Sequence, residues 1–551
     1  MSGSATFDTM GANIVKGSKN VIARFSFKSS RRGAIIFGLA AGGMISLQGL
    51  AFAATYTGEL ARSGFATTLA SNPTLGILYG EIRNIETPAG YMVYRSLPFM
   101  AFLGAIWGLA VATRLLRGQE EDGRLELLLT GKDTLVSGML HILKGIGASM
   151  VVGFTLSAIV LVLLGRFDDI RVSASASLFL AVALFSPAAV FIAIGAVLSQ
   201  LAATRRRAMM YGAVLLVIFF VLRSLGNVIE SLYWTKYFTP FGWVDKSHPV
   251  TGSDWVWLLP IAGLVIFCLT LAGYFAGHRD LGESIIADDE TAKPRYSLLG
   301  GPFGLGFRLT RGALIGWALT TVGVAGLMAS IAKTASEAVA SSNSLTKAIE
   351  NLAGSNNAIA VAFIGLGGFM IAVLLMLVIA TGLGRVREDE AKGFADNFLV
   401  NSVSRTSWLV QRSLLLVMAT AVICFLGNLT SHLSARAQGI DISGSTLLMG
   451  GFNLLGPALM MLGVGVLIFG IKPRLTSILL YTWIAWSFVI EMIGSVVTLS
   501  DAVIKTSLMR HISLVPGMQP DWKTFITIST IGLIAFAIGA ALFARRDLAN
   551  E

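Results

Sequence analysis

Apolar runs, each close to the ~20 residues that a helix needs to cross a bilayer, alternate with short polar segments along this chain. The runs consist mainly of Leu, Ile, Val, Ala, Phe and Gly, and polar or charged residues bound each of them. They predict twelve membrane spans, at 33–54, 97–113, 143–165, 175–200, 208–223, 255–276, 312–332, 358–383, 413–430, 446–471, 476–499 and 524–543. This pattern is typical of an all-α polytopic membrane protein.

Composition and charge agree with that topology. The 551 residues are 54% hydrophobic, with a mean hydropathy of +0.74 and a net charge of +11. Residues 1–32 are basic but lack an apolar core with a cleavage site, so we expect a retained cytoplasmic amphipathic segment. Most Lys and Arg then lie in inner loops, as the positive-inside rule requires. We therefore expect a multi-pass protein of the plasma (inner) membrane with both termini cytoplasmic, and no nucleic-acid partner, because the basic residues are scattered.

The predicted spans carry little that resembles a chemical site. Cys268 and Cys424 both fall within apolar runs, so we interpret them as small buried hydrophobic residues and expect no metal and no disulfide. Paired carboxylates, a His cluster and a Ser–His arrangement are missing at membrane depth, which argues against an intramembrane enzyme.

Shifting the chain against itself by about 270 residues aligns its two halves. Coinciding pairs include Pro187 with Pro457, Gly195 with Gly465, Tyr211 with Tyr481, Arg117 with Arg387, Glu120 with Glu390, Gly123 with Gly393, and Glu126 with Asp396. An offset of 267 lays Arg279-Asp-Leu on Arg546-Asp-Leu, just after the last span of each half. We predict two parallel six-helix repeats, at 33–277 and 312–551, joined by a cytoplasmic linker at 278–311.

Charge is concentrated in one short stretch, RGQEEDGRLELLL, which starts at Arg117 after the second span and has a degenerate copy after the eighth. If it is helical, Arg117 with Glu121 and Glu120 with Arg124 form i,i+4 pairs above a leucine strip. The second copy offers Arg385 with Asp389 and Glu388 with Lys392. An amphipathic helix in the headgroups is one interpretation. Acidic residues avoid an anionic membrane surface, which favours a docking surface for another protein, present in two copies.

The segment 113–129 resembles the cytoplasmic loop of bacterial ABC exporter permeases, notably the fused two-half polyketide-antibiotic and multidrug exporter permeases of actinobacteria. Phe241-Gly-Trp243, His248-Pro249 and Arg279-Asp-Leu281 are also similar. The resemblance implies the type-2 ABC exporter transmembrane fold, with about 12 helices, and makes the loop a coupling helix that docks on an ATPase. Its core residues would be Glu120, Glu121, Gly123, Arg124 and Glu126. The second copy departs from this core with Ala391, Lys392 and Phe394, so the two docking sites are expected to be unequal.

The chain has no Gly-x-x-x-x-Gly-Lys-Ser/Thr loop, so nucleotide must be bound elsewhere. We expect a permease subunit that is not itself an enzyme and binds no cofactor. Two copies of a separate ABC ATPase would hold ATP and Mg²⁺, and an amphipathic antibiotic or drug-like compound would be exported through the membrane. A lipid or glycolipid exporter of the same class and an ion-coupled twelve-helix carrier are the alternatives.

Charges at membrane depth are costly and usually face a cavity or a partner. Arg223, at the outer end of the fifth span, and Glu491, in the eleventh, are candidates for a pair across an outer gate. Snorkelling of Arg223 to the interface is the alternative. The segments 224–254 and 500–523 are candidate caps by resemblance, and Pro187 and Pro457 are predicted to shape the fourth and tenth spans or only their packing.

Overall fold

Helices are the regular elements of the part of the chain that the structure describes. The computed structural model describes residues 4–70, 79–129, 134–286, 296–298, 301–340, 357–394, 403–440, 442–494, 500–513, 515–516 and 518–546. No strand occurs among them. The chain divides into two compact units, unit 1 (Met1–Ala292) and unit 2 (Lys293–Glu551), and the division falls within residues 278–311.

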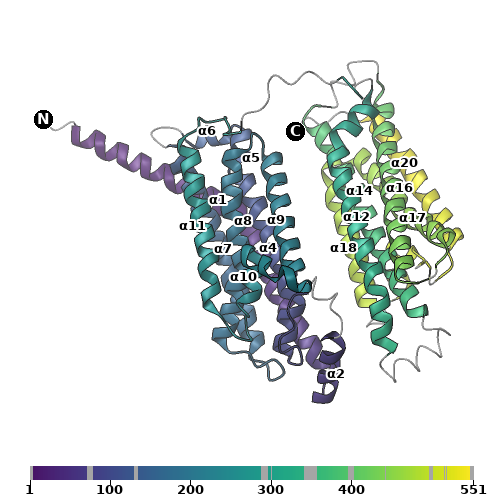
Figure 1. The fold of residues 1–551 in the computed structure, drawn as a ribbon. Helices are drawn as coiled ribbons and strands as arrows, with labels where there is room; N and C mark the ends of the chain where they lie inside the picture. Colours follow the sequence, from purple (N-terminus) through teal and green to yellow (C-terminus); the bar gives the residue numbers. More distant parts are fainter. Residues whose placement is uncertain are drawn as a thin grey trace. The chain divides into compact units, whose positions relative to one another are not determined.

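Unit 1 is a bundle of long helices that run side by side (Figure 1). Its elements are α1 (Ser4–Thr55), α2 (Glu59–Ala70), α4 (Pro88–Leu115), α5 (Arg117–Glu121), α6 (Arg124–Leu128), α7 (Leu135–Gly165), α8 (Ala174–Leu201), α9 (Arg205–Val228), η1 (Glu230–Phe238), α10 (Pro240–Lys246), η2 (Trp255–Trp257) and α11 (Leu258–Gly277). The most buried helix is α8, which packs against α4, α7, α9 and α11. The short helices α5 and α6 lie at one end of the bundle and α2 at the other (Figure 1).

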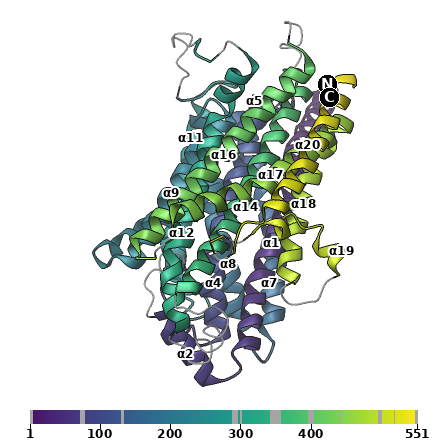
Figure 2. The same ribbon diagram turned by 90° about the vertical axis from the view of Figure 1, so that its right-hand side faces the viewer.

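Unit 2 is also a bundle of long helices (Figure 2). It comprises α12 (Pro302–Ala340), α14 (Asn357–Ala391), α16 (Arg405–Ala437), α17 (Gly444–Ile471), α18 (Pro473–Gly494), α19 (Asp501–Ile504), η3 (Met509–His511) and α20 (Trp522–Arg545). Its central helix is α17, which packs against α14, α16, α18 and α20.

The register of the repeat is visible in the helix bounds. The helices α8 and α17 begin at residues 174 and 444 and end at 201 and 471, so each bound is displaced by 270. Ser173 and Ser443 cap them in the same way, because each hydroxyl accepts from the backbone N–H three residues further on. Pro187 and Pro457 both lie buried inside these helices, which continue past them.

Eleven helices in the described part of the chain are long and apolar enough to cross a membrane. The eleventh predicted span, 476–499, overlaps α18, which is not among those eleven, and residues 495–499 lie outside the described residues. The helices extend beyond the predicted spans: α4 begins at Pro88, not at 97, because Tyr91, Tyr94 and Arg95 interrupt the apolar run without breaking the helix. Likewise, α1 joins part of the predicted amino-terminal segment 1–32 to the first span without a break.

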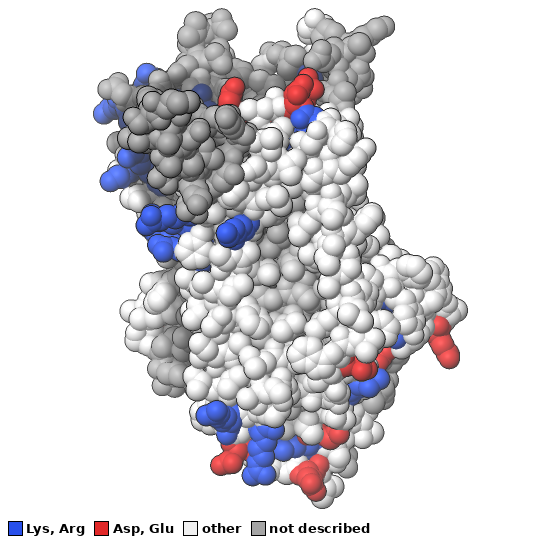
Figure 3. Space-filling view, turned by 90° about the vertical axis from the view of Figure 1, so that its left-hand side faces the viewer, with Lys and Arg blue, Asp and Glu red and all other residues white. Residues whose placement is uncertain are grey.

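Charged side chains gather at the two ends of unit 1, and an uncharged belt separates them on the face that Figure 3 shows. Within this belt helices approach closely where glycine allows it. A Cβ on Gly38 would lie 2.2 Å from the carbonyl oxygen of Gly153, so α1 and α7 meet with their backbones in contact.

Candidate functional site

The charged stretch of unit 1 folds as two short helices, α5 and α6, with a turn between them. Gly123 has a φ of 70°, the left-handed conformation that ends a helix and that glycine adopts without strain. The prediction of one amphipathic helix is therefore wrong. Glu120 and Arg124 lie on different helices and do not form the predicted pair.

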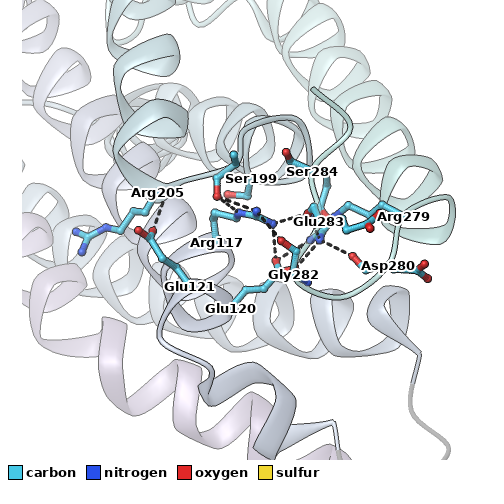
Figure 4. Close-up of polar contacts among 12 residues, drawn as sticks. Arg117, Glu120, Glu121, Ser199, Arg205, Arg279, Asp280, Gly282, Glu283 and Ser284 are labelled. Atoms are coloured by element: carbon cyan, nitrogen blue, oxygen red, sulfur yellow. Dashed lines mark hydrogen bonds and ion pairs between the residues drawn. The ribbon is translucent and has the colours of Figure 1, made fainter. Parts of the chain in front are cut away.

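Arg117 is buried beneath this turn (Figure 4), with 3% of its surface exposed. Its Nε and Nη2 donate to the carbonyl of Ala203 at 3.0 and 2.8 Å, and its Nη1 donates to the carbonyl of Glu283 at 2.7 Å. Nη1 also lies 3.2 Å from the carboxylate of Glu120. Arg117 thus joins the start of α5 to the segment before α9 and to the segment after α11.

Glu120 forms the most enclosed ion pair of this end. Its two carboxylate oxygens accept from Nη1 and Nη2 of Arg279 at 2.5 and 2.7 Å, and its Oε1 also accepts from the backbone N–H of Gly282 at 2.8 Å. The side chains of Glu120 and Arg279 are 3% and 4% exposed. Nε of Arg279 donates to Gln200 at the end of α8, so this bidentate pair ties α5, α8 and the end of α11 together.

Glu121 also faces inward with one oxygen, which accepts from the backbone N–H of Arg205 at 2.9 Å (Figure 4). This contact satisfies an otherwise free N–H at the amino terminus of α9, where negative charge is favourable. The i,i+4 pair predicted between Glu121 and Arg117 does not form.

The outward side of the turn consists of Asp122, Gly123, Arg124, Glu126 and Leu127, which we call the turn surface. All five residues are exposed, and Leu127 is 74% exposed although it is a large apolar side chain. Between them Leu125 is buried and anchors α6 to the core of unit 1. The stretch therefore has two sides. Inward, Arg117, Glu120 and Arg279 form a buried ionic cluster, which we call the clamp, and outward lies the exposed turn surface.

Unit 2 repeats the pair of Glu120 with Arg279 at Glu390 and Arg546. Glu390 is 2% exposed and accepts from Nη2 of Arg546 at 2.6 and 2.9 Å with its two oxygens. Gly393 has a φ of 71°, matching Gly123. The predicted pair of Glu388 with Lys392 forms at 2.7 Å, whereas Asp389 pairs with Arg412 at 2.5 Å.

The remaining predicted residues of this copy that the structure describes do not repeat the contacts described for unit 1. Arg387 is half-buried in α14, and Asp396 lies outside the described residues. Phe394 is exposed, where the first copy has Arg124.

The sequence analysis singled out the charged members of these pairs, Glu120, Arg279, Glu390 and Arg546, but not their pairing, and it missed Gln200. The Arg-Asp-Leu repeat after the last helix of each half was the available signal, because Arg279 and Arg546 recur together with Glu120 and Glu390. The two charges are separated by 159 residues in the first half and 156 in the second, and such a recurring pair is the pattern expected of an equivalent contact within each half.

Arg223 lies at the opposite end of unit 1, near the end of α9, and it is 1% exposed. Its Nε and Nη2 donate to the two oxygens of Asp245 at 2.6 and 3.0 Å, and Nη2 also donates to the carbonyl of Tyr79. The side chain is thus enclosed by protein and does not snorkel outward. The side chain of Glu491 lies outside the described residues, so the gate pair of Arg223 with Glu491 stays a prediction.

A second buried pair reinforces this end. Lys236 belongs to η1, and its side chain is fully buried. Its Nζ donates to Glu81 at 2.6 Å. Burial by itself raises the pKa of Glu81, but the hydrogen bond and charge of Lys236 outweigh it, so this pKa lies below its usual value. Burial, assisted by the charge of Arg83, lowers the pKa of the nearby His248. Residues 79–83 are in this way attached to the predicted cap 224–254.

No group of three His, Cys, Asp or Glu that could hold a metal ion occurs among the described residues. The structure therefore offers two kinds of feature: turns at one end of each unit, with a buried clamp beneath them, and a buried ionic cluster at the other end of unit 1.

Comparison with known proteins identifies relatives of this chain. The family model described as "Multidrug efflux system permease Rv1217c, C-terminal domain" matches residues 34–277 and 299–544. The multidrug efflux system permease protein Rv1217c of Mycobacterium tuberculosis is 26% identical over 505 residues, which cover 90% of this chain and 88% of that protein. This chain belongs to the family of the multidrug efflux system permease Rv1217c.

Proposed function

We propose that the chain is the transmembrane permease subunit of an ATP-driven ABC exporter that moves amphipathic, drug-like compounds out of the cell. Its family and its multidrug efflux relative support a permease role. The sequence contains no Gly-x-x-x-x-Gly-Lys-Ser/Thr loop, so in this proposal a separate subunit hydrolyses ATP. Both termini and the turn surface face the cytoplasm in this proposal, in agreement with the positive-inside rule.

The observation that carries the proposal is the two-sided construction of the charged turns. Outward, Asp122, Arg124 and Glu126 offer charge to a partner without a strong contact of their own, since Asp122 and Arg124 are 3.9 Å apart and more than half exposed. Inward, Glu120 and Arg117 connect residues 117–126 to the end of α8, to the segment before α9 and to the segment after α11. A force applied to the turn by a partner therefore reaches several long helices, as a rigid-body switch between two access states requires.

Two such turns, one in each half, suit two copies of an ABC ATPase. The copies are not equivalent: unit 1 presents Asp122 and Glu126, whereas the described part of the unit 2 copy presents an exposed Glu388–Lys392 pair and the ring of Phe394. We infer that the two ATPase subunits bind with unequal affinity, the first contact being more dependent on salt than the second.

Reversing charge on the turn surface tests this proposal. We expect Asp122→Lys combined with Glu126→Lys to weaken ATPase binding about tenfold or more. The two lysines would repel the basic partner surface that suits Asp122 and Glu126, and the buried clamp residues are untouched. The measurements are the affinity for the ATPase and the substrate-stimulated ATPase rate in proteoliposomes.

Asp168→Lys is the matched control, because Asp168 has a 99% exposed side chain in the turn between α7 and α8 at the opposite end of unit 1. It should leave both quantities unchanged. Normal ATPase binding by the charge-reversed variant would show that the turn surface is not the docking site.

A further inference from the structure

Unit 2 contains an apolar pocket of about 300 Å³ between α16 and α17. Its floor includes Cys424, Asn428, Gly451 and Leu455, and Phe425 and Phe452 stand at its rim. All six residues belong to unit 2, and they lie on two helices that are long and apolar enough to cross a membrane. A pocket of this size is at the lower end of the range that encloses drug-sized ligands.

The same place in unit 1 is filled. Because the helix bounds are displaced by 270 residues, Phe154 and Phe185 occupy the positions of Cys424 and Leu455. The two rings pack edge to face with centroids 6.0 Å apart, and Phe185 is 3% exposed. At these two positions unit 1 has two phenylalanines, whereas unit 2 has the smaller Cys424 and Leu455. The smaller side chains leave the space that forms the pocket of unit 2.

The floor of unit 2 has also gained a polar group. Ala158 and Ala181 of unit 1 are replaced by Asn428 and Gly451. Glycine leaves room for the amide at the second position, since a Cβ on Gly451 would lie 3.0 Å from Nδ2 of Asn428. An amide at this depth is costly unless something bonds to it, so its introduction together with the space around it points to a ligand.

Asn428 is only half satisfied by the protein. Its side chain is 5% exposed, and Nδ2 donates to the carbonyl of Cys424 at 2.9 Å. Asn428 lines the pocket, and among the described residues nothing donates to its Oδ1. A ligand that completes the site must therefore supply an O–H or N–H donor.

The rim changes in the opposite direction to the floor. Phe425 and Phe452 replace Thr155 and Val182, and both rings are exposed on the surface of unit 2. Aromatic residues have thus been lost from the floor and gained at the edge, where they can cover a planar or aliphatic molecule arriving from the hydrocarbon.

We propose that this pocket is a binding site, particular to unit 2, for an apolar molecule of drug-like size that donates one hydrogen bond to Asn428. An acyl chain fills an apolar groove but carries no donor along its length, so the amide favours a hydroxyl- or amide-bearing compound over a lipid tail. The site does not depend on the ATPase partnership proposed above.

Photolabelling of the full-length chain in lipid nanodiscs tests the site, with 4-hydroxybenzophenone as the probe and benzophenone as the probe without a donor. We expect saturable labelling of residues 421–455 by the hydroxylated probe, located by mass spectrometry, and about fivefold less with benzophenone or with Asn428→Ala. Leu455→Phe, which restores the residue of unit 1, should reduce the labelling roughly tenfold by filling the floor.

Leu414→Phe is the control for an added ring, because Leu414 is exposed on α16 but does not line the pocket. It should label like the unmodified chain. Equal labelling by both probes that Asn428→Ala leaves unchanged is what a lipid groove would give, and it would overturn the proposal. Equal labelling of residues 151–185 in unit 1 would also overturn it. If Leu455→Phe fails to fold, the two probes and Asn428→Ala still decide.

Discussion

Glu120→Ala is expected to destabilise unit 1 by about 3–5 kcal/mol, because it leaves the guanidinium groups of Arg117 and Arg279 buried without their shared carboxylate. The measurement is thermal unfolding of the purified chain, in which we expect a clear fall in Tm. A double-mutant cycle with Arg279→Met should show strong coupling, since the second change removes much of the charge left unpaired by the first.

Glu126→Ala, on the same stretch but on the turn surface, serves as the control and should leave Tm unchanged. Equal Tm values for Glu120→Ala and Glu126→Ala would mean that the clamp does not hold this end of unit 1. Glu390→Ala should repeat the effect in unit 2, where the pair with Arg546 is also enclosed.

Asp245→Asn is expected to have the second largest effect, at about 2–4 kcal/mol. The substitution keeps the shape of the side chain but removes the charge opposite Arg223, which is 1% exposed and held at 2.6 Å. Asp245 belongs to residues 230–246, which pack against α9, the helix that carries Arg223. Loss of the pair should loosen this segment, so we expect a lower Tm and faster cleavage of residues 230–246 in limited proteolysis.

Asp254 has an exposed side chain in the predicted cap 224–254, beyond residues 230–246, and Asp254→Asn should behave like the unmodified chain. Resistance of Asp245→Asn to both heat and protease would show that Arg223 is satisfied by other groups.

The fold was largely predictable from sequence, because apolar runs and their repeat depend on local composition and on a fixed offset. The all-helical architecture is confirmed, and the register of 270 residues reappears in α8 and α17. The helix ends were not predictable from hydropathy, because the helix continues through polar residues such as Tyr94 and Arg95 once the bundle packs around it.

The candidate site was predictable in its position but not in its orientation. Spacing along a helix finds neighbours four residues apart, whereas the partner of Glu120 is Arg279, in a segment that only the fold brings close. The same reasoning explains Arg223, which lies in α9, whereas its partner Asp245 lies in α10, beyond the intervening η1. Gly123 carried the one local signal for a turn, and the interpretation as a single helix overlooked it.

Cys424 illustrates a further limit. It is buried, as its place in an apolar run predicted, yet its small size matters only beside Phe154, its counterpart in unit 1. The contrast between Cys424 and Phe154 has a structural meaning because α7 and α16, and α8 and α17, share a common register.

The most direct test of the central claim, that the turns dock a separate ATPase, is purification of the tagged full-length chain from native membranes followed by native mass spectrometry. We expect a complex of one chain with two ABC ATPase subunits, and loss of at least one subunit in the Asp122→Lys, Glu126→Lys variant. A chain that purifies without any ATPase, and transports compounds on an ion gradient alone, would contradict it.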